Sequence, residues 1–324
     1  MLATKFARVR IAAKDKIVGT TMVRSHGMES ALKAVRLAKI TGIDLSAMAL
    51  ESYRNQNTRA ESGMTTHFFI QSFPSQKEAF KAYCKYNAEK GMILIDTYGY
   101  EKGLKEFMEI AKEFEENGRK IRGVVLDSGD YIEMSKKVRS ELDKNGLNYI
   151  KIVVMGNLDE YKIDKIVKEK VPIDLLGVAT EVLNSTDSPK LEVVFKMVEI
   201  ERNSKMNPVI KLASGKRCYP CKKQVFIIRD NQNKIQKRII GLDKKIYPHQ
   251  IIPLGEKVLI KMIEDGQLIY KFPNIVDTKD YFLNQVKEYP LQIFELDSQF
   301  EFPIEISQSL LDIFEETKDN LAQA

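Results

Sequence analysis

The sequence has few cysteines and no long apolar run. Cys84, Cys218 and Cys221 are the only cysteines in 324 residues. They are too few for a disulfide framework, which fits a reducing compartment. No window approaches ~18 uncharged apolar residues, the length that a transmembrane helix needs, and repeats and low-complexity segments are absent. We therefore expect a cytoplasmic protein that does not cross a membrane.

The basic residues are not concentrated in any one segment. The chain has 51 Lys and Arg against 45 Asp and Glu, for a net charge of +6. Lysines alternate with glutamates on the expected helix faces, whereas proteins that bind nucleic acid usually gather their basic residues. We interpret this charge as a solvated surface that favours anionic small substrates, and we predict no nucleic-acid partner.

The first fourteen residues contain four basic side chains and no acidic one, a composition that is also seen in transit peptides. However, Leu2, Phe6, Val9 and Ala13 fall close to one helical stripe, and the segment continues without a break that resembles a cleavage site. We therefore predict a structural helix at the N-terminus.

The middle of the chain repeats one pattern, in which an apolar segment ends in a small or acidic cluster before an amphipathic helix. The predicted strands are 92–95, 123–126, 150–155 and 173–176, and the clearest helices are 103–116 and a segment that ends at Asn145-Gly146. This spacing of ~25–30 residues is typical of βα units in a parallel sheet. Ligands bind at the carboxyl edge of such a sheet, whether it forms a barrel or a doubly wound layer.

The pattern changes near Lys205, where short strands and polar turns replace the βα units. Predicted hairpins comprise 224–229 with 234–240 and 258–263 with 268–271, and a last helix covers 307–318. We therefore predict an α/β domain over 1–204 and a β-rich C-terminal region with a terminal helix over 205–324.

Two carboxylates flank a glycine where the strand 123–126 ends. Asp127 and Asp130 in the sequence Asp127-Ser128-Gly129-Asp130 suit Mg²⁺ or ribose hydroxyls, because both ligands need hard oxygen acceptors at close range. The structural alternative is a helix N-cap, in which Asp127 or Ser128 accepts hydrogen bonds from unpaired backbone N–H groups.

Small residues follow the next two predicted strands, at Gly156-Asn157 and at Gly177-Val178-Ala179-Thr180. Turns that are rich in exposed N–H groups can hold a phosphate, as the late strands of barrels often do. The alternative is that both are ordinary βα turns.

His67 lies among small residues in Gly63-Met64-Thr65-Thr66-His67. Imidazole titrates near neutral pH, so His67 is a candidate general base or nucleophile, and a structural histidine is the alternative.

Cys218 and Cys221 form a C-x-x-C pair, which suggests zinc or redox chemistry. Zinc would lack two ligands, because no second such pair follows. Lys211, Lys216 and Arg217 precede the pair, and we interpret them as phosphate contacts or surface charge.

Several short motifs, in one order along the chain, resemble nicotinate phosphoribosyltransferases. They are Ala3-Thr4-Lys5, GMESALKAVR (27–36), GMTTHFFIQSF (63–73), IDTY (95–98), GVVLDSGD (123–130), NLDE (157–160), GVAT (177–180) and VFKMV (194–198), followed by Asp265-Gly266 and Phe272-Pro273.

The resemblance implies an irregular (β/α) barrel of the type II phosphoribosyltransferase kind with a β-rich C-terminal appendage. It also implies that nicotinate and phosphoribosyl pyrophosphate become nicotinate mononucleotide and pyrophosphate in NAD biosynthesis. ATP is the co-substrate, Mg²⁺ is the cofactor, and the enzyme is a homodimer.

The same resemblance assigns roles to residues. His67 is the histidine that ATP phosphorylates, and Asp127 lies beside the ribose and the pyridine ring. The remaining predicted substrate-binding residues are Arg24, Asp130, Gly156, Asn157, Gly177, Thr180 and Lys211, and the predicted metal ligands are Asp127 and Asp130.

The sequence departs from the family pattern at two arginines that contact ligands. These positions are Val23 and Val125 here. Arg122 cannot replace the arginine at position 125, because it lies three residues earlier on a strand and therefore points to the opposite face. Each lost arginine contact in a desolvated site costs about 2–5 kcal/mol.

The departures leave alternatives open. Family members usually have an additional N-terminal domain, so this chain is expected to be a fragment, a split subunit or a degenerate homologue. An impaired enzyme is one functional outcome. A second is an inactive homologue that binds a phosphorylated nucleotide or a partner subunit as a regulator, and a third is a phosphoribosyltransferase for another base such as nicotinamide.

Overall fold

The computed structural model describes residues 1–46, 63–213, 218–243 and 255–322. Two compact units are distinguished by their internal contacts. The first comprises Met1–Leu191 with Ile275–Lys279, and the second comprises Glu192–Asn274 with Asp280–Ala324. The division at 204/205 stays a prediction.

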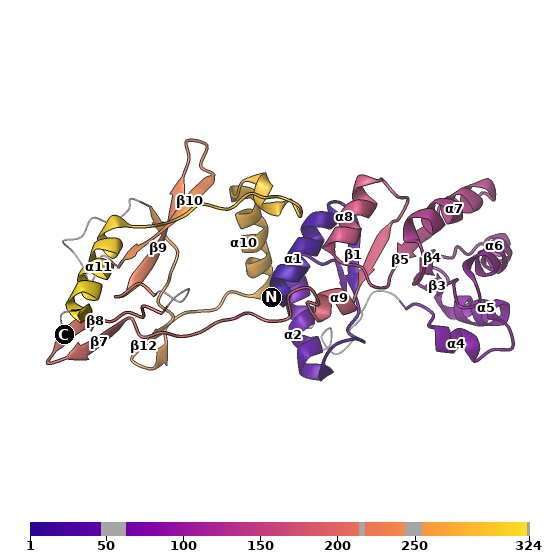
Figure 1. Cartoon of the computed structure of the whole chain (residues 1–324). Coiled ribbons are helices and arrows are strands. Elements are labelled where there is room, and N and C mark those ends of the chain that lie inside the picture. Colours follow the sequence, from indigo (N-terminus) through magenta and orange to yellow (C-terminus); the bar gives the residue numbers. More distant parts are fainter. Residues whose placement is uncertain (47–62, 214–217, 244–254, 323–324) are drawn as a thin grey trace. The chain divides into compact units, whose positions relative to one another are not determined.

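The first unit contains a six-stranded parallel sheet with the order β2-β1-β6-β5-β4-β3 (Figure 1). Its strands are β1 (Ile17–Thr20), β2 (Leu45–Ser46), β3 (Met92–Leu94), β4 (Gly123–Leu126), β5 (Lys151–Val154) and β6 (Leu175–Val178). The four predicted strands are therefore present, although β6 begins two residues later than predicted. The predicted α/β class is confirmed.

β1 and β6 are the first and last strands of this sheet along the sequence, and they are neighbours, as the first and last strands of a barrel are. β1 pairs in parallel with β6, with Gly19 opposite Gly177. At the other end of the order, Met64 forms a parallel bridge with Met92 of β3. The residues between β2 and Met64 include 47–62, which lie outside the described ranges, so closure of the barrel stays a prediction.

The sheet is held by apolar strands that are buried on both faces. All four residues of β4 are buried, and β4 pairs with β5 so that Val124 lies opposite Ile152. Burying a Val, Leu or Ile side chain contributes about 1.5–3 kcal/mol, so a continuous apolar run is stable only in such a covered sheet.

Amphipathic helices connect the strands. They are α1 (Leu2–Ala13), α2 (Gly27–Ile40), α4 (His67–Gln71), α5 (Gln76–Asn87), α6 (Tyr100–Glu116), α7 (Tyr131–Lys144), α8 (Glu160–Lys168) and α9 (Thr180–Leu183). Helix α6 buries Leu104, Phe107 and Ile110 at helical spacing, and α7 ends before Asn145 and Gly146 as predicted. No helix in the described ranges is long and apolar enough to cross a membrane.

Helix α1 confirms the predicted N-terminal helix and is joined to α8 by a buried ion pair. Phe6 and Val9 are fully buried. Glu160, also fully buried, lies 2.8 Å from Lys5 Nζ and 2.7 Å from Arg8 Nε. The pairing of both cations with one carboxylate satisfies charges that would otherwise be costly to bury.

The second unit is built around a four-stranded sheet with the order β11-β9-β10-β14. Its strands are β9 (Lys223–Arg229), β10 (Ile235–Leu242), β11 (Glu256–Lys257) and β14 (Ile304–Ile306), with the separate hairpins β7 (Glu199–Arg202)–β8 (Lys205–Pro208) and β12 (Ile263–Glu264)–β13 (Gln267–Leu268). Helix α11 (Gln308–Ala322) buries Leu310 and Phe314. The β-rich C-terminal part is therefore confirmed.

Two helical segments of the C-terminal part were not predicted from the sequence. They are α10 (Ile275–Glu288), which spans the boundary between the two units, and η1 (Leu291–Phe294). Helix α10 has no buried residue.

Candidate active site

Residues from several parts of the chain meet at the carboxyl edge of the parallel sheet. Asp96 follows β3, Asp127 follows β4, and Gly156 follows β5. Strand pairing in parallel brings these positions to one edge. His67, at the start of α4, is brought to the same place by its contact with Asp127.

Asp96 positions the backbone and side chains that follow β4. Its Oδ2 atom accepts hydrogen bonds from the N–H of Asp127 (3.1 Å) and from Oγ of Ser128 (2.7 Å). Its Oδ1 atom is buried and has no hydrogen-bond partner among the described residues. The sequence prediction did not include Asp96, although an acidic residue directly after an apolar strand is the same signal that selected Asp127.

His67 is oriented by a threonine on the neighbouring strand end. Its Nδ1 atom lies 3.1 Å from Oγ1 of Thr97, and its Nε2 atom lies 3.7 Å from Oδ2 of Asp127. The side chains of His67 and Asp127 are 44% and 41% exposed. Both groups therefore face solvent and can reach a ligand, with the imidazole held at one nitrogen.

The electrostatic environment of Asp127 opposes its ionisation. Burial, followed by the neighbouring charge of Asp96, raises the pKa of the Asp127 carboxyl. His67 and Arg24 act in the opposite direction on the same pKa. A bound cation would also favour the ionised form of Asp127.

Gly156 is required by the turn after β5. It has φ +110°, and a Cβ atom there would lie 2.2 Å from the hydroxyl of Tyr131 and 2.9 Å from the carbonyl of Asp127. The hydroxyl of Tyr131 donates a hydrogen bond to that carbonyl (3.2 Å). The absence of a side chain at Gly156 thus lets the β5 turn approach the backbone of Asp127. The next residue, Asn157, is exposed, and its carbonyl accepts from Nζ of Lys162 (2.5 Å).

Asp130 serves as the N-cap of α7. Its Oδ1 atom accepts hydrogen bonds from the N–H groups of Ile132 (3.0 Å) and Glu133 (3.2 Å). The N-cap alternative is therefore realised at Asp130, rather than at Asp127 or Ser128. The role of Asp130 as a metal ligand stays a prediction, with one of its two oxygens engaged in the cap.

Few acidic side chains are available to a metal at this edge. In the described part of the chain, no group of three or more His, Cys, Asp or Glu residues is arranged to hold a metal ion. Mg²⁺ is commonly held by one or two carboxylates together with waters and substrate phosphates. The carboxylates of Asp96 and Asp127 fit this mode of binding.

The turn predicted at 177–180 begins later than the sequence suggests. Gly177 is a strand residue, because it belongs to β6 and pairs with β1. A Cβ atom at Gly177 would lie 2.6 Å from Cγ of Met155, so this glycine makes room for a neighbouring side chain. Thr180 begins the short helix α9, and only Ala179 and Thr180 follow the strand.

The two departures from the family pattern differ in their environment. Val125 is fully buried in β4, and strand alternation places it on the same face as Asp127. Val23 is 81% exposed, and Arg24, which follows it, is exposed as well. Arg122 precedes β4 at the amino edge, so it does not supply the cation that is absent at Val125.

The remaining predicted residues belong to the second unit. The N–H of Lys211 donates to Sγ of Cys218 (3.1 Å), and Cys221 is buried. Lys216 and Arg217 lie outside the described residues. The roles of Lys211 as a phosphate contact and of the cysteine pair in zinc or redox chemistry stay predictions.

Comparisons with known proteins give a consistent family of relatives. No model of a known protein family matches the sequence. A nicotinate phosphoribosyltransferase of Mycobacterium tuberculosis is 30% identical over 315 residues, which cover 96% of this chain and 65% of that protein. One of Bacillus subtilis is 28% identical, with 95% of this chain and 66% of that protein covered. The chain thus spans just under two thirds of the length of these relatives.

Solved structures agree with these relatives in fold. The crystal structure of nicotinate-nucleotide pyrophosphorylase from Pyrococcus furiosus matches with a TM-score of 0.69 and 25% identity, covering 89% of this chain and 69% of that chain. The crystal structure of human nicotinic acid phosphoribosyltransferase matches with a TM-score of 0.73 and 18% identity, covering 97% of this chain and 73% of that chain. The fold is therefore that of the pyridine nucleotide phosphoribosyltransferases. Within that class, the chain is a relative of the nicotinate phosphoribosyltransferases, and the predicted resemblance is confirmed.

Proposed function

We propose that the protein is a nicotinate phosphoribosyltransferase that acts in NAD biosynthesis. It converts nicotinate and phosphoribosyl pyrophosphate to nicotinate mononucleotide and pyrophosphate while ATP is hydrolysed to ADP and phosphate, which makes it an ATP-dependent ligase and glycosyltransferase. The observation that carries this proposal is the convergence of His67 and Asp127 at the carboxyl edge of the sheet.

His67 is the proposed acceptor of the γ-phosphoryl group of ATP. In the tautomer that is protonated at Nδ1, this nitrogen donates to Thr97 and leaves the lone pair on Nε2 for attack on phosphorus. The bond from phosphorus to the bridging oxygen breaks, ADP leaves, and water later releases phosphate from the histidine. The carboxylate of Asp127, 3.7 Å from Nε2, stabilises the positive charge on the ring.

Asp127 has a second proposed role at the ribose. Breaking the bond between C1′ and pyrophosphate develops positive charge on the ribose, and a fixed carboxylate nearby stabilises it. A bound Mg²⁺ ion would supply positive charge to neutralise the pyrophosphate. Asp96 and Asp127 are the side chains that best fit Mg²⁺, and Asp130 contributes its uncapped oxygen.

The 5′-phosphate is proposed to bind the turns after β5 and β6. Gly156, which has no Cβ, and Asn157 provide the turn after β5, and Thr180 provides a hydroxyl after β6. Gly177, within β6, is proposed to leave room for the ligand. Arg24 is proposed to supply a cationic contact. We also propose, from the family resemblance, a cytoplasmic homodimer.

The test is a product assay. Purified protein is incubated with nicotinate, phosphoribosyl pyrophosphate, ATP and Mg²⁺, and nicotinate mononucleotide is quantified by chromatography. We expect product from the wild type and none above background from His67→Ala or Asp127→Asn. A wild-type signal no higher than that of His67→Ala would contradict the proposal.

The burial of Val125 favours a second candidate, an inactive homologue that binds a phosphorylated nucleotide as a regulator. A valine on the Asp127 face of β4 contributes no charge to a ligand carboxylate or phosphate. Binding of phosphoribosyl pyrophosphate in a calorimeter without turnover would support this candidate. Parallel assays with nicotinamide in place of nicotinate test whether the missing charge changes the base that is used.

A further inference from the structure

The backbone of Asp127 is held from both sides by the side chains of other residues. On one side, Oδ2 of Asp96 accepts a hydrogen bond from the N–H of Asp127 (3.1 Å). On the other side, the hydroxyl of Tyr131 donates a hydrogen bond to the carbonyl of Asp127 (3.2 Å). Neither contact uses the Asp127 carboxylate, whose Oδ2 atom lies 3.7 Å from Nε2 of His67. The backbone is therefore fixed while the carboxylate stays available to a ligand.

Tyr131 closes the loop that follows β4. It is the first residue of α7, and the side chain of Asp130 caps this helix directly before it. From this fixed position, the Tyr131 hydroxyl reaches back four residues to the carbonyl of Asp127. The enclosed loop contains Gly129, which has φ +91°. The hydroxyl thus ties the beginning of the loop to the beginning of the helix.

The same side chain lies against the turn that follows β5. A Cβ atom on Gly156 would lie 2.2 Å from the hydroxyl oxygen of Tyr131 and 3.3 Å from its Cζ atom. It would also lie 2.9 Å from the carbonyl of Asp127. The hydroxyl is therefore hydrogen-bonded to the turn after β4 and packed against the turn after β5. Because it contacts both turns, it sets the separation between them.

We propose that Tyr131 is a positioning residue for a ligand that carries a ribose 5-phosphate group. This role rests on the proposed function, in which Asp127 lies at the ribose and the turn at Gly156 binds the 5′-phosphate. One ribose 5-phosphate group engages both turns only when their separation matches the distance between its two ends. Tyr131 acts through Asp127 and Gly156, because it holds their turns in place before the ligand binds. A site that is ordered in advance binds more tightly.

The test is a calorimetric titration with phosphoribosyl pyrophosphate and Mg²⁺, in the absence of nicotinate and ATP. Tyr131→Phe removes the hydroxyl and keeps the ring, so the hydrogen bond to the Asp127 carbonyl is lost. The dissociation constant is expected to rise about 2–10-fold. A residue with a merely structural role would change the free energy of unfolding in urea but not this constant, because binding is measured on the folded protein.

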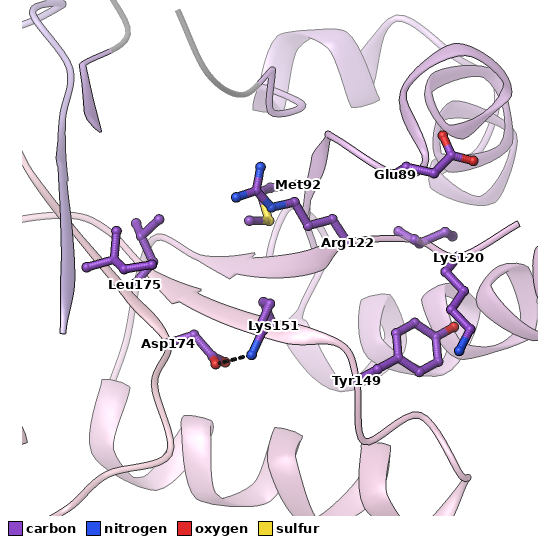
Figure 2. A pocket seen from close by; sticks show the side chains of 10 residues that line it. Glu89, Met92, Lys120, Arg122, Tyr149, Lys151, Asp174 and Leu175 are labelled. Atoms are coloured by element: carbon purple, nitrogen blue, oxygen red, sulfur yellow. Dashed lines mark hydrogen bonds and ion pairs between the residues drawn. The ribbon is translucent and has the colours of Figure 1, made fainter. Parts of the chain in front are cut away.

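Tyr149→Phe is the matched control, since it also removes one tyrosine hydroxyl. Tyr149 is half-buried, as Tyr131 is. However, it precedes β5 and lines a cavity at the amino edge of the sheet, where the ammonium of Lys120 lies beside its ring (Figure 2). This variant is expected to bind phosphoribosyl pyrophosphate as the wild type does.

The outcomes separate this role from the proposed reaction. Weaker binding by Tyr131→Phe, with Tyr149→Phe unchanged, supports the positioning role even if the wild type forms no nicotinate mononucleotide, in which case the proposed catalysis alone fails. Equal dissociation constants for the wild type and Tyr131→Phe would overturn the role even if product is formed. An equal loss of affinity in both variants would also overturn it, and a wild type that does not bind phosphoribosyl pyrophosphate would overturn both proposals.

Discussion

Replacing Gly156 with alanine tests how closely the turn after β5 approaches Asp127. An alanine at φ +110° adopts a backbone conformation that costs about 1–2 kcal/mol. Its Cβ atom would lie 2.2 Å from the hydroxyl of Tyr131, which must then move away from the Asp127 carbonyl. The lost hydrogen bond adds about 0.5–1.5 kcal/mol. We expect a total loss of about 2–4 kcal/mol in the free energy of unfolding.

Two further variants separate the parts of this loss. Gly146→Ala provides the conformational penalty alone, because Gly146 has φ +76° and a Cβ atom there meets nothing within 4 Å. Tyr131→Ala removes the side chain with which the methyl group added by Gly156→Ala would collide. In the Tyr131→Ala background, the effect of Gly156→Ala should therefore fall toward that of Gly146→Ala.

Urea unfolding followed by circular dichroism measures these free energies. If Gly156→Ala destabilises no more than Gly146→Ala, the close approach of the turn to Tyr131 is not a constraint. The same conclusion follows if its effect is unchanged in the Tyr131→Ala background, because the collision would then have no energetic consequence. Either result would refute the reasoning.

Three other predictions concern the same unit. Because burial raises the folded-state pKa of Asp127 above its ordinary value of 3.8, the folded state holds that proton more tightly, and its stability falls as the pH rises through that range. The wild type should therefore lose stability relative to Asp127→Asn between about pH 3 and pH 6, and the difference between their free energies of unfolding should then level off. A difference in unfolding free energy that does not vary with pH would argue against a raised pKa of Asp127. Thr97→Val releases Nδ1 of His67 and should lower the rate of product formation about 2–10-fold, and an unchanged rate would exclude the orienting role. Glu160→Ala leaves Lys5 buried without one of its partners and should destabilise the protein by about 3–5 kcal/mol in urea unfolding; a loss below about 1 kcal/mol would show that the pair behaves as an exposed one.

Much of the sheet could be predicted because its strands are uninterrupted apolar runs. Strand β4 coincides with the predicted 123–126, where four buried residues end at an acid. The prediction for β6 was displaced because glycine at 177 suggests a turn, whereas here it accommodates Met155. That contact joins residues from two strands, so local sequence does not contain it. Closure of the barrel depends on further pairing of this kind.

The sequence predicted where the candidate site lies better than it predicted what each residue does there. The carboxyl edge follows from the parallel order of the strands, which placed Asp127 and the turn at Gly156 correctly. Asp96 and Thr97 were missed as site residues, because their importance lies in contacts with residues about thirty positions away in sequence. Sequence spacing also does not distinguish a metal-binding acid from the N-cap that Asp130 forms.

The pairing of β1 with β6 has a consequence for folding during synthesis. Thr20 donates its hydroxyl hydrogen to the carbonyl of Val178, 158 residues later. At a synthesis rate of about 5–20 residues per second, β1 leaves the ribosome about 8–30 s before β6 does. Throughout that interval, the β6-facing edge of β1 has no partner from its own sheet, and open edges of this kind promote aggregation. We therefore expect chaperone dependence to be greatest for nascent chains that end before β6, and to decline once β6 has left the ribosome.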